Sequence, residues 1–85
     1  TGNKPLNWEL SRLIKYKNPM MRGADIINVQ KALITNGCSV GATGADGVFG
    51  RNSDTAVRAF QRSKGLAADG IVGKKTCIAL GGTWK

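Results

Sequence analysis

The sequence contains no histidine among its 85 residues. This absence excludes a Ser-His-Asp triad, a Cys-His catalytic pair and any histidine-based zinc site. Acidic residues are scarce as well, with 5 Asp and Glu against 13 Lys and Arg, so few carboxylate pairs are available for acid–base catalysis. The 2 cysteines are too few for a disulfide-rich scaffold or a four-cysteine zinc site. We therefore expect no metal and no cofactor.

Long apolar runs are also absent. No stretch approaches the roughly 18 apolar residues that predict a membrane-spanning helix. The apolar fraction of 41% is ordinary for a globular protein, and this length suits one domain with one small core. The sequence starts at Thr1 with no signal-peptide pattern, which predicts a processed product or a fragment of a longer protein.

The net charge of +8 is the strongest compositional signal. A surface this basic favours an anionic partner, which can be a nucleic acid, a membrane surface or a polyanionic matrix. Charge alone does not distinguish these three classes of partner.

A nine-residue pattern occurs twice, over residues 45–53 (ADGVFGRNS) and 68–76 (ADGIVGKKT). Asp-Gly is a tight-turn dipeptide in which glycine can adopt positive φ. The second glycine of each copy, Gly50 or Gly73, precedes a helical pattern and is expected to be its N-cap. Ser53 and Thr76 then fall in the first helical turn, where their hydroxyls are expected to bond open backbone amides. Each copy predicts one unit in which a turn leads into a helix.

Apolar periodicity predicts three helices, over residues 25–36, 51–64 and 74–80. Each is followed by a glycine that can end it, namely Gly37, Gly65 or Gly81. The predicted fold is therefore all-α, a compact three-helix bundle with two repeated Asp-Gly units and an N-terminal arm.

The first segment has no clear helical period, and Pro19 would break a helix there. Residues 1–19 are interpreted as an N-terminal arm or an interdomain linker, and residues 20–85 as the domain. An arm would pack on the core through Trp8 and Met20. Trp84, close to the last residue, is expected to be loosely held and exposed.

Four segments carry a resemblance to a known family. They are Asp25-Ile26 through Val29-Gln30 to Leu33, Asp46-Gly47-Val48-Phe49-Gly50, Ala56 to Gln61 with Gly65-Leu66, and Asp69 to Thr76. In order and spacing this set resembles the peptidoglycan-binding domain of cell-wall hydrolases, over roughly residues 20 to 81.

The resemblance implies a non-catalytic, three-helix module. Such a module targets a linked amidase, muramidase or peptidase, as in autolysins and phage endolysins, to peptidoglycan. It implies a monomer that acts outside the cell at the wall, secreted or released by phage lysis, with no nucleic-acid partner.

Two departures from the family pattern involve the cysteines. Cys77 stands where the family usually has Trp, and Cys38 where an aromatic residue is frequent. This leaves two alternatives open, a Cys38–Cys77 disulfide that compensates for the lost aromatics and two small buried thiols that never meet.

The candidate ligand-binding residues come from the repeated units and from the middle helix. Arg51, Arg58 and Arg62 share one helical face, and arginine suits a two-pronged grip on a stem-peptide carboxylate. A purely structural role remains the alternative for the turn aspartates, the glutamine and the phenylalanine. The full set is Asp46, Gly47, Phe49, Gly50, Arg51, Arg58, Gln61, Arg62, Asp69, Gly70 and Lys74.

The alternative function is a basic nucleic-acid-binding helical domain. The connection from Gly37 to Gly50 is too long for the usual helix-turn-helix, and the sequence lacks interleaved basic and aromatic residues. A stand-alone hydrolase is disfavoured because the chain offers no credible nucleophile.

Overall fold

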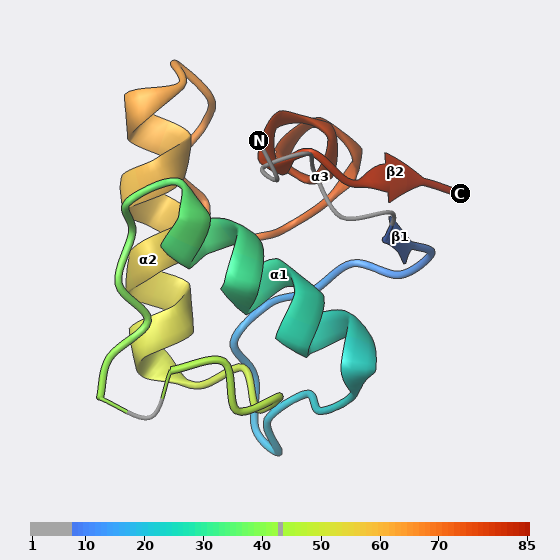
Figure 1. Ribbon diagram of the computed structural model, residues 1–85, viewed down its shortest axis with the longest axis vertical. Coiled ribbons are helices and arrows are strands. Elements are labelled where there is room, and N and C mark those ends of the chain that lie inside the picture. Colours follow the sequence, from blue (N-terminus) through green and yellow to red (C-terminus); the bar gives the residue numbers. More distant parts are fainter. Residues whose placement is uncertain (1–7, 43) are drawn as a thin grey trace.

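The computed structural model describes residues 8–42 and 44–85. Three helices dominate it: α1 (Ala24–Thr35), α2 (Arg51–Ser63) and α3 (Lys74–Leu80). Two short strands, β1 (Glu9–Leu10) and β2 (Thr83–Trp84), pair in parallel and join the two ends of this region (Figure 1). The predicted three-helix fold is confirmed, and the strand pair is an addition that the sequence did not predict. No helix in the described part of the chain is long and apolar enough to cross a bilayer.

The core is built from the faces that the apolar periodicity predicted. Ile26, Val29 and Leu33 of α1 are buried against Val57 and Phe60 of α2 in one apolar cluster. Burial of apolar side chains of this size stabilises the fold by about 1.5–3 kcal/mol each.

All three helices end in the same way. At the end of α1, Cys38 N donates to Leu33 O (2.8 Å) and Gly37 N donates to Ile34 O (2.9 Å). This is a Schellman motif, and it requires the left-handed backbone that Gly37 adopts with φ +83°. Equivalent pairs of bonds end α2 at Gly65 and α3 at Gly81, as predicted.

The described part of the arm packs on the core. Trp8, Leu10 and Ile14 are buried, and Ile14 forms an antiparallel bridge with Val72. Met20, the other contact expected of the arm, is instead 41% exposed. The prediction for Trp84 is also wrong, because the residue lies in β2 and packs partly buried against the cluster.

Candidate functional site

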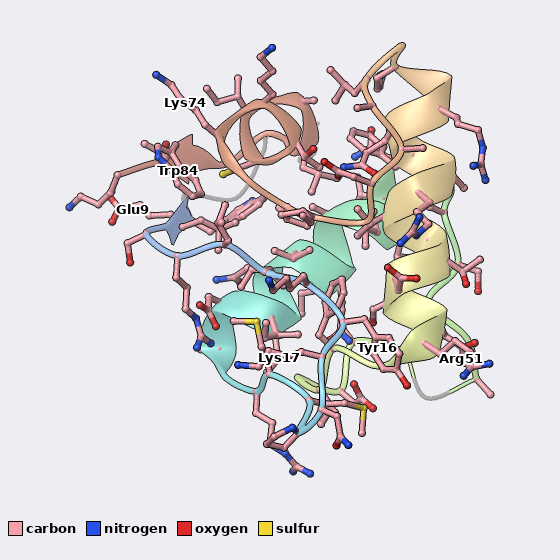
Figure 2. All side chains as sticks on the ribbon, turned by 180° about the vertical axis from the view of Figure 1, so that it is seen from behind. Glu9, Tyr16, Lys17, Arg51, Lys74 and Trp84 are labelled. Carbon is pink, nitrogen blue, oxygen red and sulfur yellow. The ribbon has the colours of Figure 1, made fainter. Side chains whose placement is uncertain are left out.

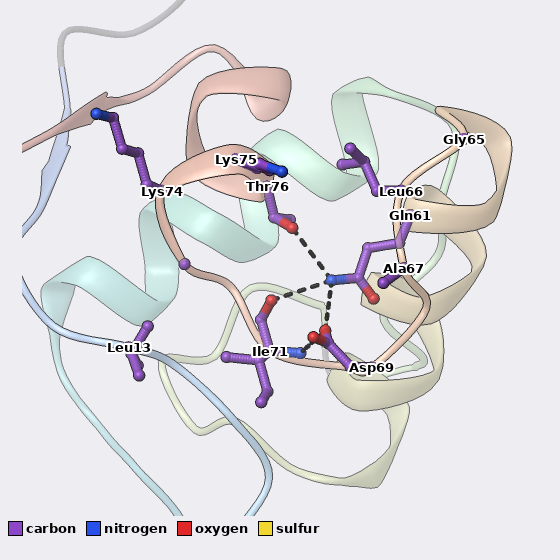
Figure 3. Close-up of a pocket in the computed structure, with 11 residues that line it drawn as sticks. Leu13, Gln61, Gly65, Leu66, Ala67, Asp69, Ile71, Lys74, Lys75 and Thr76 are labelled. Carbon is purple, nitrogen blue, oxygen red and sulfur yellow. Dashed lines mark hydrogen bonds between the residues drawn. The ribbon is translucent and has the colours of Figure 1, made fainter.

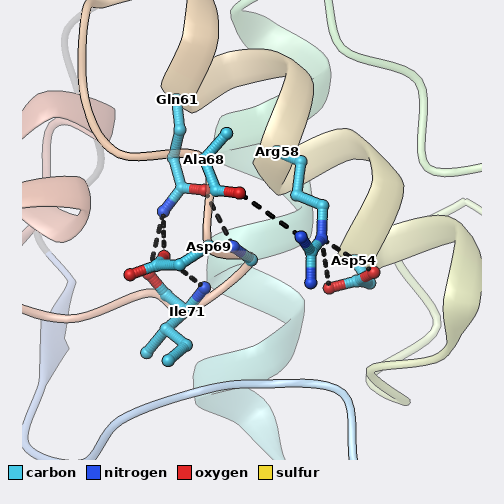
Figure 4. A network of polar contacts seen from close by, with 7 residues as sticks. Asp54, Arg58, Gln61, Ala68, Asp69 and Ile71 are labelled. Atoms are coloured by element: carbon cyan, nitrogen blue, oxygen red, sulfur yellow. Dashed lines mark hydrogen bonds and ion pairs between the residues drawn. The ribbon is translucent and has the colours of Figure 1, made fainter.

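The second Asp-Gly unit is organised around the side-chain amide of Gln61, which is buried at the end of α2. Gln61 Nε2 lies 3.0 Å from Asp69 Oδ1, 3.0 Å from Ile71 O and 3.1 Å from Thr76 Oγ1. Gln61 Oε1 accepts a 3.0 Å hydrogen bond from Gly70 N. One side chain therefore joins α2 to the turn (Figure 4) and to the first turn of α3 (Figure 3).

The first Asp-Gly unit repeats this arrangement around Gln30 of α1. Gln30 Nε2 lies 3.2 Å from Asp46 Oδ1, 2.9 Å from Val48 O and 3.0 Å from Ser53 Oγ. Gln30 Oε1 accepts a 2.8 Å bond from Gly47 N. A purely structural role was the alternative to ligand binding for Gln61, and its hydrogen bonds to the turn have this role in the structure.

The role predicted for Ser53 and Thr76 is wrong. Neither α2 nor α3 has a side-chain cap, although Gly50 and Gly73 are the N-caps as predicted. Both hydroxyls lie against the buried glutamine amides instead, because an unpaired amide in the core would cost more than an open amide at a solvated helix end.

The larger cavity of the site has a volume of about 440 Å³. This lies within the range of about 300–1,000 Å³ typical of small-molecule sites. Figure 3 shows Leu13 of the arm and Ile71 of the turn on one side, and Lys74 and Lys75 of α3 on the other. The remaining lining residues are Gln61, Gly65, Leu66, Ala67, Asp69, Gly73 and Thr76.

A second, smaller cavity of about 230 Å³ lies at the start of α2. Its walls include three predicted site residues, Asp46, Gly50 and Arg51. The others are Met20, Val40, Val48, Asn52 and Ser53. The predicted residues are therefore divided between two places, with Lys74 and Asp69 at the larger cavity and Arg51 and Asp46 at the smaller.

Arg58 and Arg62 line neither cavity. Arg58 Nε lies 3.2 Å from Asp54 Oδ2, and its Nη1 donates a 3.3 Å bond to Ala68 O (Figure 4). Arg58 and Asp54 enclose the Gly70 turn so closely that a Cβ at Gly70 would meet both side chains. Within the expected Arg51–Arg58–Arg62 face, Arg58 therefore differs from the other two, because its side chain is bonded to Asp54 and to the turn.

Phe49 is another correction among the candidate residues. Its ring is fully buried in the apolar cluster and cannot contact a ligand on the surface. Gly47 and Gly70 are buried as well, and both have positive φ, +82° and +76°. These residues shape the turns and do not present groups to solvent.

Hydrogen bonding lowers the pKa of two carboxyl groups. The amides of Ile71 and Gln61 lower the pKa of Asp69, and nearby Arg58 adds to this. The Arg12 guanidinium, 2.7 Å from Asp25 Oδ2, lowers the pKa of Asp25. Among the described residues, Arg51, Arg62, Lys74 and Lys75 form no ion pair, so their charges are open to a ligand.

Both cysteines are free thiols in the structure. Cys77 is fully buried, and this burial raises the pKa of its thiol. Cys38 is partly exposed. Of the two alternatives, the structure therefore has unpaired thiols.

Both cavities described above lie on a compact three-helix fold and are lined by residues of the Asp-Gly units. Residues 22–80 match the family described as peptidoglycan binding domain, so the chain belongs to that family. It is a binding module and not a catalytic domain.

Known relatives have the same domain within longer proteins. The chain is 40% identical over 80 residues to a "Probable N-acetylmuramoyl-L-alanine amidase" of Bacillus licheniformis, with 88% of this chain and 23% of that protein covered. It therefore spans about a quarter of that relative's length.

Two solved structures share the fold. The SleB N-terminal domain superposes with a TM-score of 0.74 at 37% identity, covering 84% of this chain and 90% of that one. The Burkholderia AP3 phage endolysin gives a TM-score of 0.72 at 36% identity, covering 82% of this chain and 25% of that one.

Proposed function

We propose that this domain binds peptidoglycan and so holds a linked cell-wall hydrolase at its substrate. Family membership and the amidase and endolysin relatives support this proposal. Tethering raises the local concentration of a catalytic domain on an insoluble substrate without any new catalytic group. On this proposal the chain acts outside the cell, at the wall, as a monomer.

The larger cavity is the site that we assign to the ligand. One observation carries this assignment: a cavity of about 440 Å³ is lined both by apolar Leu13 and Ile71 and by the basic residues Lys74 and Lys75. Peptidoglycan offers matching chemistry, with apolar sugar and alanine surfaces next to stem-peptide carboxylates. A lysine ammonium is a compact point charge that can follow a carboxylate of variable position.

The buried Gln61 network supports this site from beneath. It holds Asp69, Ile71 and Thr76, which all line the larger cavity, through hydrogen bonds of 3.0–3.1 Å. A wall held in this way is ordered before the ligand arrives, and this reduces the entropy lost on binding.

Co-sedimentation with purified, teichoic-acid-free sacculi tests the proposal. We expect the domain to pellet with sacculi at moderate salt, and Leu13→Ala with Lys74→Ala to reduce the bound fraction severalfold. Lys31→Ala is the charge-matched control, since Lys31 is exposed on α1 and lines neither cavity. Equal loss in both variants would show a charge-only attraction, and a folded domain that does not pellet would refute the proposed function.

A further inference from the structure

The two cavities are built from equivalent residues of the two Asp-Gly units. Asp46, Val48, Gly50, Arg51, Asn52 and Ser53 line the smaller cavity, and Asp69, Ile71, Gly73, Lys74, Lys75 and Thr76 line the larger. Each residue of the first set is 23 positions before its partner in the second. Five of the six pairs match in chemistry, with an aspartate, an aliphatic residue, a glycine, a basic residue and a hydroxyl-bearing residue in each unit.

The segment before α1 completes both cavities in a similar way. Val72 N donates to Ile14 O (2.8 Å), and at the equivalent place Phe49 N donates to Met21 O (2.9 Å). The residue before each acceptor, Leu13 or Met20, then covers the glycine of that unit. A Cβ at Gly73 would lie 3.2 Å from Leu13 Cδ2, and a Cβ at Gly50 would lie 3.3 Å from Met20 Sδ.

The chemistry of the two cavities is also matched. Each has an exposed apolar side chain from the arm, with Leu13 54% and Met20 41% exposed, and a basic residue, Lys74 or Arg51, on the helix. Neither Lys74 nor Arg51 forms an ion pair within the described residues. The larger cavity has one further cation, Lys75, where the smaller has Asn52. Two sites that share an apolar side chain, an aspartate and a basic residue in equivalent places are suited to the same kind of ligand.

The arm also connects the cavities. Leu13 and Met20 are separated by seven positions, which limits their distance to roughly 25 Å. Tyr16 lies on this stretch and is 45% exposed. Figure 2 shows the arm running down from β1, with Tyr16 projecting from it towards α2 and Arg51 at the lower end of that helix.

We propose that the smaller cavity is a second peptidoglycan subsite, which takes another muropeptide unit of the strand held in the larger cavity. This inference rests on the proposed function. Two linked subsites would raise the affinity for a strand well above that for a single unit, by about 10²-fold or more where both engage together. The smaller volume, about 230 Å³, suits a shorter part of the unit than the larger cavity takes.

Amide NMR titrations with two probes test the second subsite. The probes are a single disaccharide-peptide and a purified strand of several such units. We expect the single unit to shift amides in residues 48–53 as well as 71–76, and the strand to bind at least tenfold more tightly. Shifts confined to residues 71–76 would overturn the second subsite.

Matched double variants make the test specific. Met20→Ala with Arg51→Ala should lower strand affinity about tenfold and leave single-unit shifts at residues 71–76 unchanged. Leu13→Ala with Lys74→Ala should lower strand affinity about tenfold and leave single-unit shifts at residues 48–53 unchanged. Lys31→Ala should change neither quantity. If the Met20/Arg51 variant binds strands like Lys31→Ala, the second subsite is refuted while sacculus binding by the unsubstituted domain still supports the proposed function. Failure of that domain to bind sacculi would refute both.

Discussion

Gln61 is hydrogen-bonded to Asp69 across the second turn, with Nε2 of the amide 3.0 Å from Oδ1 of the carboxylate. The same carboxylate oxygen accepts from Ile71 N at 2.9 Å, so Asp69 both closes its own turn and holds the glutamine. The amide and the turn are therefore mutually dependent. Replacing either one would leave hydrogen-bonding groups of the other without a partner.

Replacement of Gln61 by Ala should strongly destabilise the domain. The substitution removes the acceptor of Gly70 N and the donor to Ile71 O, and each unsatisfied buried group costs about 1–3 kcal/mol. We expect a loss of about 3 kcal/mol in the free energy of unfolding, measured by urea denaturation. Gln30→Ala should cost a similar amount, since its bonds are equivalent. Gln61→Glu is a sharper probe, because its carboxylate would face Asp69 and should destabilise more at pH 7 than at pH 4. A change below 0.5 kcal/mol for Gln61→Ala would contradict this account.

The sequence predicted the helices well because their signals are local. Apolar spacing marks the buried face of each helix, and a glycine at a fixed place ends it. The turn chemistry of Asp46-Gly47 and Asp69-Gly70 is equally local, and it was predicted from dipeptides.

A structural role was the alternative considered for Gln61, but the partners in the two glutamine networks were not predicted because they depend on distance in space. Gln30 is 16 residues from Asp46, whereas Gln61 is only 8 from Asp69, so the repeated pattern in the sequence does not include the glutamines at a constant spacing. A signal was nevertheless present. Each glutamine falls within the apolar face of its helix, where a polar residue needs buried partners.

The arginine face was a weaker prediction for a related reason. Helical spacing placed Arg51, Arg58 and Arg62 on one side of α2, but it did not show the loop that returns Ala68 to within 3.3 Å of Arg58. Partners that come from loops are fixed by tertiary structure and are not visible in the period of one helix.

Stability should fall in acid through Asp25 and Asp69. The pKa of each is lowered from 3.8 in the folded state, by Arg12 for Asp25 and by the Ile71 amide for Asp69. The folded chain therefore binds fewer protons than the unfolded chain near that pH, so this contribution is present above pH 3.8 and is lost as pH falls through the folded pKa values. We expect a nearly constant melting temperature from pH 7 to pH 5 and a decline below about pH 4. In Asp25→Asn the decline should be shallower, and an unchanged slope would refute the assignment to this residue.

The thiols should differ in reactivity. Cys77 is buried with a raised pKa, whereas Cys38 is partly exposed at the end of α1. Because thiolate is the reactive form, we expect iodoacetamide to label Cys38 first and Cys77 only on unfolding. Mass spectrometry of the native and denatured protein, with no reductant, measures this directly. Protection of both cysteines in denaturant without reductant would show a disulfide and contradict the structure.

The arm should be required for folding, and the contact between Trp8 and Gly82 is its most sensitive point. A Cβ at Gly82 would lie 2.6 Å from the Trp8 ring, and Thr83 N donates to Trp8 O at 2.9 Å. Trp8→Ala should cost about 3–5 kcal/mol, as for other buried aromatics. Gly82→Ala should also be severely destabilising, because the ring is held between the core and the backbone and cannot move aside.

A double-mutant cycle separates this contact from general damage to the arm. In the Trp8→Leu background the smaller side chain leaves room for a Cβ, so Gly82→Ala should cost at least 1 kcal/mol less than it does beside Trp8. Chemical denaturation of the four proteins, followed by far-ultraviolet circular dichroism, gives the coupling energy. Additive effects would show that the arm and the last turn are stabilised independently. Coupling would show that residues flanking the helices at both ends form one cooperative unit with the core, as the parallel pairing of β1 with β2 implies.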